Sequence, residues 1–272
     1  MLLPNETPTP GSGSLGAGDP GKTGSVQDIV AGSTVTATVQ VVDKYFNLMS
    51  THTLESISLV TSDTYGVASA TQSLATANPQ TTFLLQMRTA GAQTATATDT
   101  NLQDPSVTWS PSVSPAAGTF NVVAGTATHL LVVSSGEALS PGRPPYDGTG
   151  GKTGTPTAQV AGSTFTITVY LTDDQYNPVL AVSSLPYIVA ASTNDNGVVY
   201  SGGNNPDFLY SGSGYINFTV MPSSAQAGFV IAASTTSGSP NGTQNIVPSL
   251  SSPIQVWRTR GGRGGDHKAG LS

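Results

Sequence analysis

The amino-acid sequence contains three segments that occur twice, and each second copy lies 130 residues after the first. A constant offset over this distance indicates duplication of a whole folding unit, because chance similarity of short motifs would not keep one spacing. Two copies of one unit share one fold, so the repeat constrains the architecture more than any other feature of the chain. The copied segments are Val30–Thr34 and Val160–Thr164, Gly21–Gly24 and Gly151–Gly154, and Asp43–Asn47 and Asp173–Asn177.

Each copy of the Val-Ala-Gly-Ser-Thr segment leads into a stretch in which apolar and polar residues alternate. Thr34–Val41 places Val and Ala on one face and Thr and Gln on the other, and Thr164–Leu171 repeats the pattern with larger apolar residues. A period of two residues is typical of a β-strand with one buried face. A helical period is missing from every window of eleven or more residues, so we expect an all-β protein.

Short alternating runs separated by Gly, Pro, Asn and Asp turns give about seven strands per copy, which is typical of a β-sandwich. We therefore expect one sandwich over residues 1–128, a second over 129–257 and a basic, Gly-rich tail over 258–272. The other predicted strands are Ser56–Thr61, Phe83–Arg88, Thr94–Thr98 and Phe120–Val123 in the first copy, and Leu130–Val133, Tyr187–Ala191, Tyr215–Val220, Phe229–Ser234 and Ile254–Trp257 in the second.

The junction between the copies is short, since Thr126–His129 joins the last strand of one directly to the first strand of the next. Such a connection is expected to restrict bending between the modules. The same lead-in has no counterpart before Leu2, so we expect an upstream portion beyond this sequence.

The charge is divided unevenly along the chain. Residues 1–257 carry a net charge of −9, and the last fifteen residues carry +3. An acidic body argues against nucleic acid or an anionic membrane as the main partner. The Arg-Gly-Gly sequence of the tail can bind RNA in other contexts, but one short instance on an acidic body predicts an ordinary terminus.

The chain has no cysteine, which excludes disulfides, thiolate catalysis and Cys-ligated zinc. Its first six residues lack the basic and apolar segments of a signal peptide, and apolar runs are too short to span a bilayer, so we expect no membrane insertion. An extracellular location would therefore require an export signal that is unconventional, already removed or outside this sequence.

The stretch Val169–Val179 resembles bacterial immunoglobulin-like domains, the modules of large surface and adhesion proteins of the invasin and intimin class. An alternating strand, an Asp, a short turn and Asn177-Pro178-Val179 carry the likeness, whereas the first copy departs from it after Asn47 with Leu48-Met49. The resemblance implies two tandem immunoglobulin-like β-sandwiches that serve as a spacer, stalk, adhesin segment or filament unit. It specifies a fold and implies no catalytic site.

Residues Gly16–Thr23 satisfy the phosphate-binding P-loop pattern letter for letter. That loop works because a strand delivers it to a helix N-terminus whose amides surround the phosphate. Here a strand follows, and the second copy has Tyr146 in place of the first glycine. The shared Gly-Lys-Thr-Gly therefore predicts a turn and no nucleotide or other cofactor.

Clusters of Asp and Asn are the candidates for metal binding, because calcium takes oxygen ligands from carboxylates and carbonyls. None of them has the spacing of an EF-hand. Since all lie between predicted strands, the favoured interpretation is that they cap tight turns, with calcium kept as the alternative. The candidates are Asp43, Asn47, Asp173, Asp174 and Asn177, and also Asn194, Asp195 and Asn196.

Catalysis finds no support in the sequence. His52, His129 and His267 lie far apart, the carboxylates are sparse, and no nucleophile elbow leads from a strand into a helix. We expect no catalytic and no cofactor-binding residues, and hence no enzyme.

The two lysines of the Gly-Lys-Thr-Gly segments raise the hypothesis of a Lys–Asn cross-link. Lys22 and Lys152 would need a buried position beside an Asn and an acid. Asn121 is available in the first copy, but Gln255 takes its place in the second. The flanking glycines predict exposed turns instead.

The sequence thus favours a non-enzymatic, extracellular structural protein of the bacterial cell surface, a stalk or the repeating subunit of a filament. Its expected partners are copies of itself or other surface proteins, bound through strand edges and termini. The alternative is a calcium- or carbohydrate-binding module of a larger adhesin. Sugar could stack on aromatic side chains, and the candidates are Trp109, Tyr200, Phe208, Tyr210 and Trp257.

Overall fold

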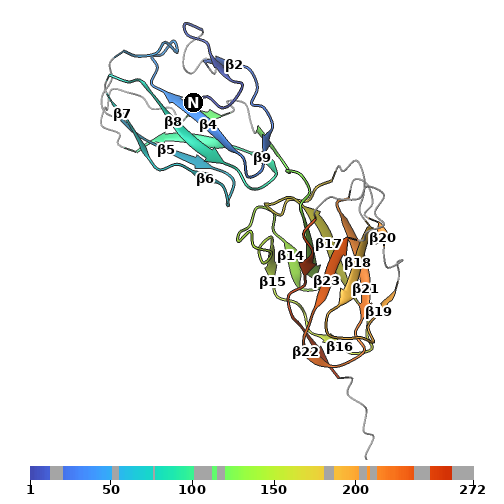
Figure 1. Ribbon diagram of the computed structural model, residues 1–272. Coiled ribbons are helices and arrows are strands. Elements are labelled where there is room, and N and C mark those ends of the chain that lie inside the picture. Colours follow the sequence, from blue (N-terminus) through green and yellow to red (C-terminus); the bar gives the residue numbers. More distant parts are fainter. Residues whose placement is uncertain are drawn as a thin grey trace, which may run out of the picture. The chain divides into compact units, whose positions relative to one another are not determined.

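A computed structural model gives the fold of the chain (Figure 1), and it describes residues 1–12, 21–50, 55–75, 77–100, 112–114, 120–180, 187–201, 207–208, 213–235 and 246–258. The all-β prediction is confirmed, because the regular structure in these ranges consists of strands. Within them no helix is long and apolar enough to cross a membrane. The chain divides into two compact units, unit 1 with 1–129, 139–152 and 171–179, and unit 2 with 130–138, 153–170 and 180–272.

Unit 1 contains a sheet that follows from the first alternating stretch. The central strand β8 pairs antiparallel with β4 on one side and with β6 on the other. Leu2 adds a bridge to Thr38 at the outer edge of β4. Counting Leu2 as the first strand, the order is A-B-E-D, as in immunoglobulin domains. The strands are β4 (Thr34–Gln40), β6 (Val67–Ala68) and β8 (Gln80–Gln86).

Two further sheets of unit 1 form the layer opposite the β4-β8-β6 sheet. One sheet has the order β11-β10-β5-β7, and another has the order β3-β12-β9. In the second sheet β3 runs parallel to β12, the last strand of the copy. The strands are β3 (Ile29–Val30), β5 (Glu55–Thr61), β7 (Gln72–Leu74), β9 (Gly91–Gln93), β10 (Ala95–Asp99), β11 (Ser112–Ser114) and β12 (Phe120–Val123).

Unit 2 repeats this arrangement strand for strand. Its sheets have the orders β13-β17-β21-β19, β20-β18-β23-β24 and β16-β25-β22, and β16 again runs parallel to the last strand, β25. The first of these sheets is the A-B-E-D sheet of an immunoglobulin-like sandwich. The strands are β13 (His129–Ser134), β16 (Gln159–Val160), β17 (Phe165–Thr172), β18 (Tyr187–Ser192), β19 (Val199–Ser201), β20 (Asp207–Phe208), β21 (Tyr215–Met221), β22 (Gln226–Phe229), β23 (Ile231–Thr235), β24 (Ser249–Leu250) and β25 (Ile254–Trp257).

Each copy has a short hairpin between its first strand and the short strand that runs parallel to its last one. Strand β1 (Thr7–Pro8) pairs with β2 (Lys22–Thr23), and β14 (Glu137–Leu139) pairs with β15 (Lys152–Gly154). The Gly-Lys-Thr-Gly segments supply the second strand of each hairpin. The sequence predicted a turn there, and the hairpin partner was not foreseen.

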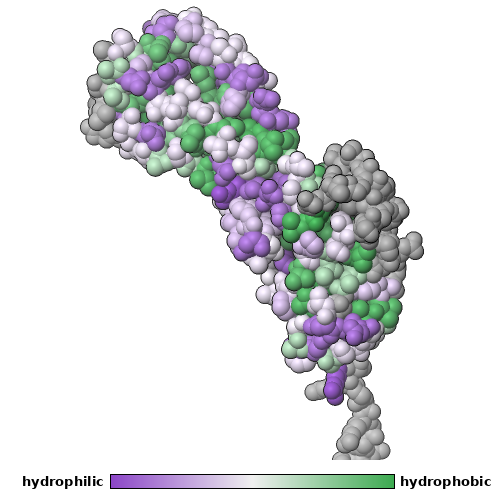
Figure 2. All heavy atoms as spheres, in the orientation of Figure 1, coloured by the Kyte–Doolittle hydropathy of each residue, from purple (hydrophilic) through white to green (hydrophobic). Residues whose placement is uncertain are grey.

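The cores follow from the alternation seen in the sequence. Ala37 of β4 lies opposite Phe83 of β8, and both are buried together with Val39 and Leu85 two residues further along their strands. Along β17 every second residue from Phe165 to Leu171 is likewise buried. On the face drawn in Figure 2, hydrophobic residues lie among hydrophilic ones in each unit. The hydroxyl-rich faces of the strands thus meet solvent, as the period predicts.

We predict that Phe83→Ala destabilises unit 1 by about 3–5 kcal/mol, because it opens a cavity in a core position with no solvent exposure. The matched control is Leu84→Ala on the same strand, where the side chain is 59% exposed and the expected change is within about 0.5 kcal/mol. Urea unfolding followed by circular dichroism measures both. Equal losses for the two variants would contradict the burial pattern of β8.

Candidate functional site

The candidate site begins with the five-residue turn Asp43–Asn47, which follows β4 in the first copy. Oδ1 of Asp43 accepts the backbone amides of Tyr45 at 2.8 Å and Asn47 at 2.9 Å, and Oδ2 accepts Nδ2 of Asn47 at 3.0 Å. These hydrogen bonds lower the pKa of Asp43 below its ordinary value, and the bond from the Asn47 side chain has the largest effect. The carboxylate therefore holds the turn together.

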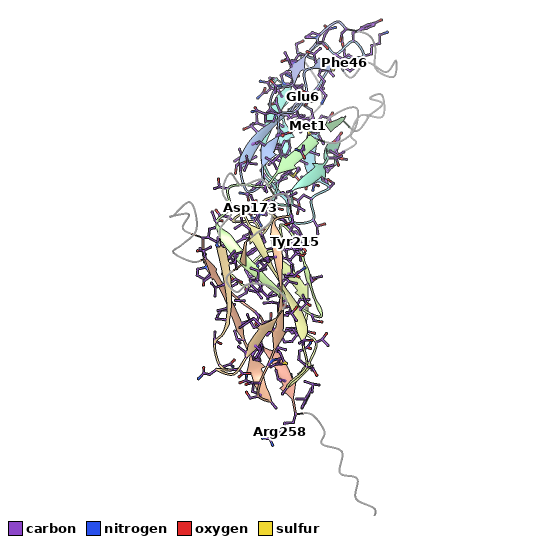
Figure 3. The ribbon with its side chains drawn as sticks, turned by 90° about the vertical axis from the view of Figure 1, so that its right-hand side faces the viewer. Met1, Glu6, Phe46, Asp173, Tyr215 and Arg258 are labelled. Carbon is purple, nitrogen blue, oxygen red and sulfur yellow. The ribbon has the colours of Figure 1, made fainter. Side chains whose placement is uncertain are left out.

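The second copy of the turn, Asp173–Asn177, has the same internal bonds. Oδ1 of Asp173 accepts the amides of Gln175 at 2.8 Å and Asn177 at 2.9 Å, and Oδ2 accepts Nδ2 of Asn177 at 3.0 Å. Both copies lie in unit 1, where Figure 3 shows Phe46 and Asp173 at well-separated places.

The fourth residue of each turn connects it to the Gly-Lys-Thr-Gly hairpin. Phe46 and Tyr176 have positive φ values of 63° and 60°, which directs each ring back over a glycine of the hairpin. A Cβ atom on Gly21 would collide with the ring of Phe46, and one on Gly151 would collide with that of Tyr176. Two of the three duplicated motifs are therefore one packed contact, which the sequence spacing did not reveal.

The lysines of the hairpins are buried, so the prediction of exposed turns is wrong for their side chains. Nζ of Lys22 lies 2.8 Å from Oε1 of Glu6 and donates to the Met1 carbonyl at 3.0 Å; Figure 3 shows Glu6 beside Met1. Lys152 is also buried. The glycines have the positive φ values that bend the backbone, and the lysine side chain between them is buried all the same.

The Lys–Asn cross-link receives no support from this arrangement. Nζ of Lys22 contacts Glu6, and Asn121 is exposed on β12. The acid beside Lys22 was not predicted, although Glu6 and Glu137 lie at nearly the repeat offset. Each accepts a backbone amide three residues earlier, from Leu3 at 2.7 Å and from Ser134 at 2.9 Å.

The P-loop pattern lies partly outside the described residues, since 13–20 are not among them. Its described end, Gly21–Thr23, enters β2 and is followed by β3 and β4, with no helix start there to bind phosphate. The lysine that would reach the phosphates is held by Glu6.

The calcium candidates are distributed over separate turns. Within the described ranges, His, Cys, Asp and Glu form no group of three that could hold a metal. Asp174 is exposed, and its Oδ1 accepts a hydrogen bond from Oγ1 of Thr128 at 2.5 Å. Asn194 caps another loop through Gly228 and Val230, and Asn196 is exposed. Calcium binding stays a hypothesis.

The other single-residue candidates have varied surroundings. His129 lies 3.4 Å from Asp174, whereas His52 and His267 fall outside the described residues. Trp257 is 58% exposed and Tyr200 is half-buried. Trp109 and Tyr210 lie outside the described residues, and Phe208 is described only as part of β20.

Asp63 is a second carboxylate that fixes a loop, the one that follows β8 in unit 1. Oδ2 of Asp63 accepts the amides of Arg88 at 2.6 Å and Thr89 at 2.8 Å, while Oδ1 accepts Oγ1 of Thr89 and the amide of Tyr65. Burial alone would raise the pKa of Asp63, but these hydrogen bonds outweigh it and lower the pKa. No motif in the sequence singled out this residue.

Asp195 does the same in unit 2, for the loop after β21. Its Oδ2 accepts the amides of Ser223 at 2.8 Å and Ser224 at 3.3 Å, and its Oδ1 accepts the Ser223 hydroxyl. The hydrogen bonds again overcome burial, so the pKa of Asp195 is lowered. The sequence grouped Asp195 with calcium candidates, and the structure gives it a counterpart in Asp63.

The second turn is inserted among these loops of unit 1. Oδ1 of Asn177 accepts the amide of Ala90 at 2.8 Å, and its Nδ2 donates to the carbonyl of Arg88 at 2.9 Å. Oδ2 of Asp173 accepts the amide of Gly125 at 2.8 Å. Asn177 is fully buried, so the turn and the Asp63-held loop form one continuous polar contact made largely to backbone atoms.

Comparison with known proteins gives matches to solved structures at low sequence identity. No family model and no curated protein matches the chain. Among solved structures, it is similar to the D0-D1 domain of intimin, with 12% identity, 85% of this chain and 94% of that one covered, and a TM-score of 0.27. It is also similar to the Yersinia pseudotuberculosis adhesin InvE, with 13% identity, coverages of 82% and 56%, and a TM-score of 0.30. Domains 5-6 of the S-layer protein SbsC match with 14% identity, coverages of 85% and 93%, and a TM-score of 0.24.

Replacing Gly151 tests the contact between turn and hairpin. Gly151→Ala should destabilise unit 1 by about 3 kcal/mol, because a positive φ disfavours alanine and the new Cβ overlaps the Tyr176 ring. Gly148→Ala has a positive φ and open space around its Cβ, so only the backbone cost of about 1 kcal/mol is expected. Urea unfolding of both variants gives the comparison, and similar losses would contradict the contact.

Asp63→Asn tests the carboxylate that holds the receiving loop. An amide accepts through one oxygen only, so two of the four donors lose their acceptor, at a cost of about 3 kcal/mol at pH 7. Because the folded-state pKa of Asp63 lies below its ordinary 3.8, its stabilisation is present above that value and is lost as the pH falls through the folded pKa. The variant should therefore approach the parent protein in melting temperature as the pH falls below 3.8 and through the lowered pKa of Asp63. The exposed Asp28→Asn is the control, and a deficit of Asp63→Asn that does not shrink in acid would contradict the assignment.

Proposed function

We propose that the chain is a non-enzymatic, load-bearing segment of a bacterial surface protein, either part of a stalk or the repeating subunit of a surface filament. Its modules are proposed to be the sandwiches over 1–128 and 129–257, with the tail over 258–272. The proposed location is extracellular.

One observation carries the proposal: in each copy an early short strand runs parallel to the last strand. β3 pairs with β12, and β16 pairs with β25. When a force pulls the start of one strand away from the end of its parallel partner, the hydrogen bonds between them are sheared together. Antiparallel partners pulled at the same end would open one bond at a time. The pairing therefore suits a module that transmits tension along a chain.

The duplicated polar residues also support a structural role. Asp43, Asp173, Asp63 and Asp195 accept backbone amides, and Lys22 is bound to Glu6. Groups shared by both copies thus hold loops in place. The alternative, a calcium- or carbohydrate-binding module, would instead predict a rise in melting temperature with ligand, through the linkage between binding and folding.

Pulling on unit 1 in two geometries tests the proposal, and the absence of native cysteine makes the attachment specific. The pair Asp28→Cys and Thr126→Cys loads β3 and β12 in shear, since the anchors flank opposite ends of the parallel pair. The pair Thr34→Cys and Thr126→Cys places both anchors beyond the same end. We expect a clearly higher unfolding force for the first pair in single-molecule force spectroscopy.

All three anchor positions are exposed, so the substitutions are expected to leave the equilibrium stability unchanged. Matching urea midpoints for the two variants would establish this. Equal unfolding forces in the two geometries would then contradict a load-bearing role for the parallel strands.

A further inference from the structure

The two copies of the Asp-to-Asn turn have the same internal structure in different surroundings. Asn177 and Asp173 are buried by the loop Arg88–Ala90 and by Gly125. In the first copy Asn47 is exposed, and among the described residues its Oδ1 accepts no hydrogen bond. The turn Asp173–Asn177 is therefore inserted between loops of unit 1, whereas in the turn Asp43–Asn47 the side chain of Asn47 is exposed to solvent.

The surface that receives the inserted turn also has a second copy. Gly32 donates its amide to the carbonyl of Met87 at 2.7 Å, and Gly162 donates to that of Pro222 at 2.8 Å. Counting onward from Met87 and Pro222, residues Arg88–Ala90 correspond to Ser223–Ala225. Asp195 holds this second loop as Asp63 holds the first. The backbone that Asn177 contacts in unit 1 is therefore already formed in unit 2.

The glycine of the repeated Val-Ala-Gly-Ser-Thr segment shows which receiving surface is occupied. A Cβ atom on Gly32 would lie 3.0 Å from the side-chain amide of Gln175, the third residue of the inserted turn. A Cβ atom on Gly162 would have nothing within 4 Å. Ser223 and Ser224 are exposed beside it, and Trp257 lines a shallow hollow together with Ala225 and Gln255.

We propose that copies of this chain join head to tail, with the Asp43–Asn47 turn of one copy inserted against the Ser223–Ala225 loop of the next. Asn47 accepts the amide of Ala225 and donates to the carbonyl of Ser223, as Asn177 does with Ala90 and Arg88. Tyr45, which is 45% exposed, takes the place of Gln175 and covers Gly162.

This inference rests on the proposed filament function and names its joint. The contact is heterologous, because the inserting and receiving surfaces are different patches, so each joined copy leaves one of each for the next. The occupant is a second copy, since the chain itself contains both halves of a contact that it already makes once in unit 1.

Site-specific cross-linking of full-length chains tests the joint. A Tyr45→Cys chain is mixed with a Gly162→Cys chain and treated with a short bismaleimide, and the control replaces the first with Leu84→Cys, an exposed position on β8. We expect at least a fivefold higher yield of the mixed dimer than in the control, increasing with protein concentration. Equal yields would overturn the proposal.

Two further variants keep the test valid if Gly162→Cys, with its positive φ, folds poorly. Ser163→Cys replaces it at an exposed neighbour, and the same excess over the control is expected. Adding Asn47→Asp to the Tyr45→Cys chain should lower the yield at least fivefold, because a carboxylate cannot donate to the Ser223 carbonyl. Asn121→Asp, the same change at an exposed site on β12, should leave the yield unchanged, and an equal loss in both would overturn the proposal.

The outcome is independent of the pulling experiment, which needs one chain only. A higher force in shear without cross-linking would reject the joint and retain the load-bearing segment. Cross-linking without the difference in force would retain the joint and reject the mechanical role.

Discussion

The structure depends on one recurrent interaction, a carboxylate that accepts several backbone amides of a loop. Among the described residues, Asp43 and Asp173 do this in the turns that follow β4 and β17, and Asp63 and Asp195 do it for the loops that follow β8 and β21. An antiparallel sandwich leaves such loops without sheet partners, so their amides need other acceptors. A side chain with two oxygens meets that need and fixes the loop conformation at the same time.

The repeat made the strands predictable but left the contacts between motifs hidden. Phe120–Val123 and Ile254–Trp257 have the predicted bounds, because period-two alternation determines which face is buried. The packing of Phe46 on Gly21 needs a positive φ at an aromatic residue, which no local propensity favours. The spacing of the glycines therefore predicted a turn, and the prediction of exposed lysines was wrong for their side chains. A residue-by-residue comparison of the two copies could have paired Glu6 with Glu137, since their separation is close to the repeat offset.

Differences between the copies are as informative as the similarities. The inserted turn has Gln175 where the exposed turn has Tyr45, and the occupied loop has Arg88 where the exposed loop has Ser223. Arg88 lies over the ring of Tyr146 at 5.2 Å from its centroid, a cation–π contact that a serine cannot make. The proposed contact between chains would thus lack the cation–π contact that Arg88 makes beside the inserted turn in unit 1. A weaker, concentration-dependent contact is the physical consequence, as expected where subunits assemble after folding.

The chemistry of the inserted turn explains how such a joint could tolerate sequence change. Asn177 contacts a backbone amide and a backbone carbonyl, and Asp173 contacts a further amide. Backbone groups are present whatever side chains a loop carries, so the receiving loop is constrained in conformation and almost free in sequence. The conformation is in turn fixed by a single aspartate. A module needs only that aspartate and a glycine at the covered position to receive the next turn, and both are present at Asp195 and Gly162.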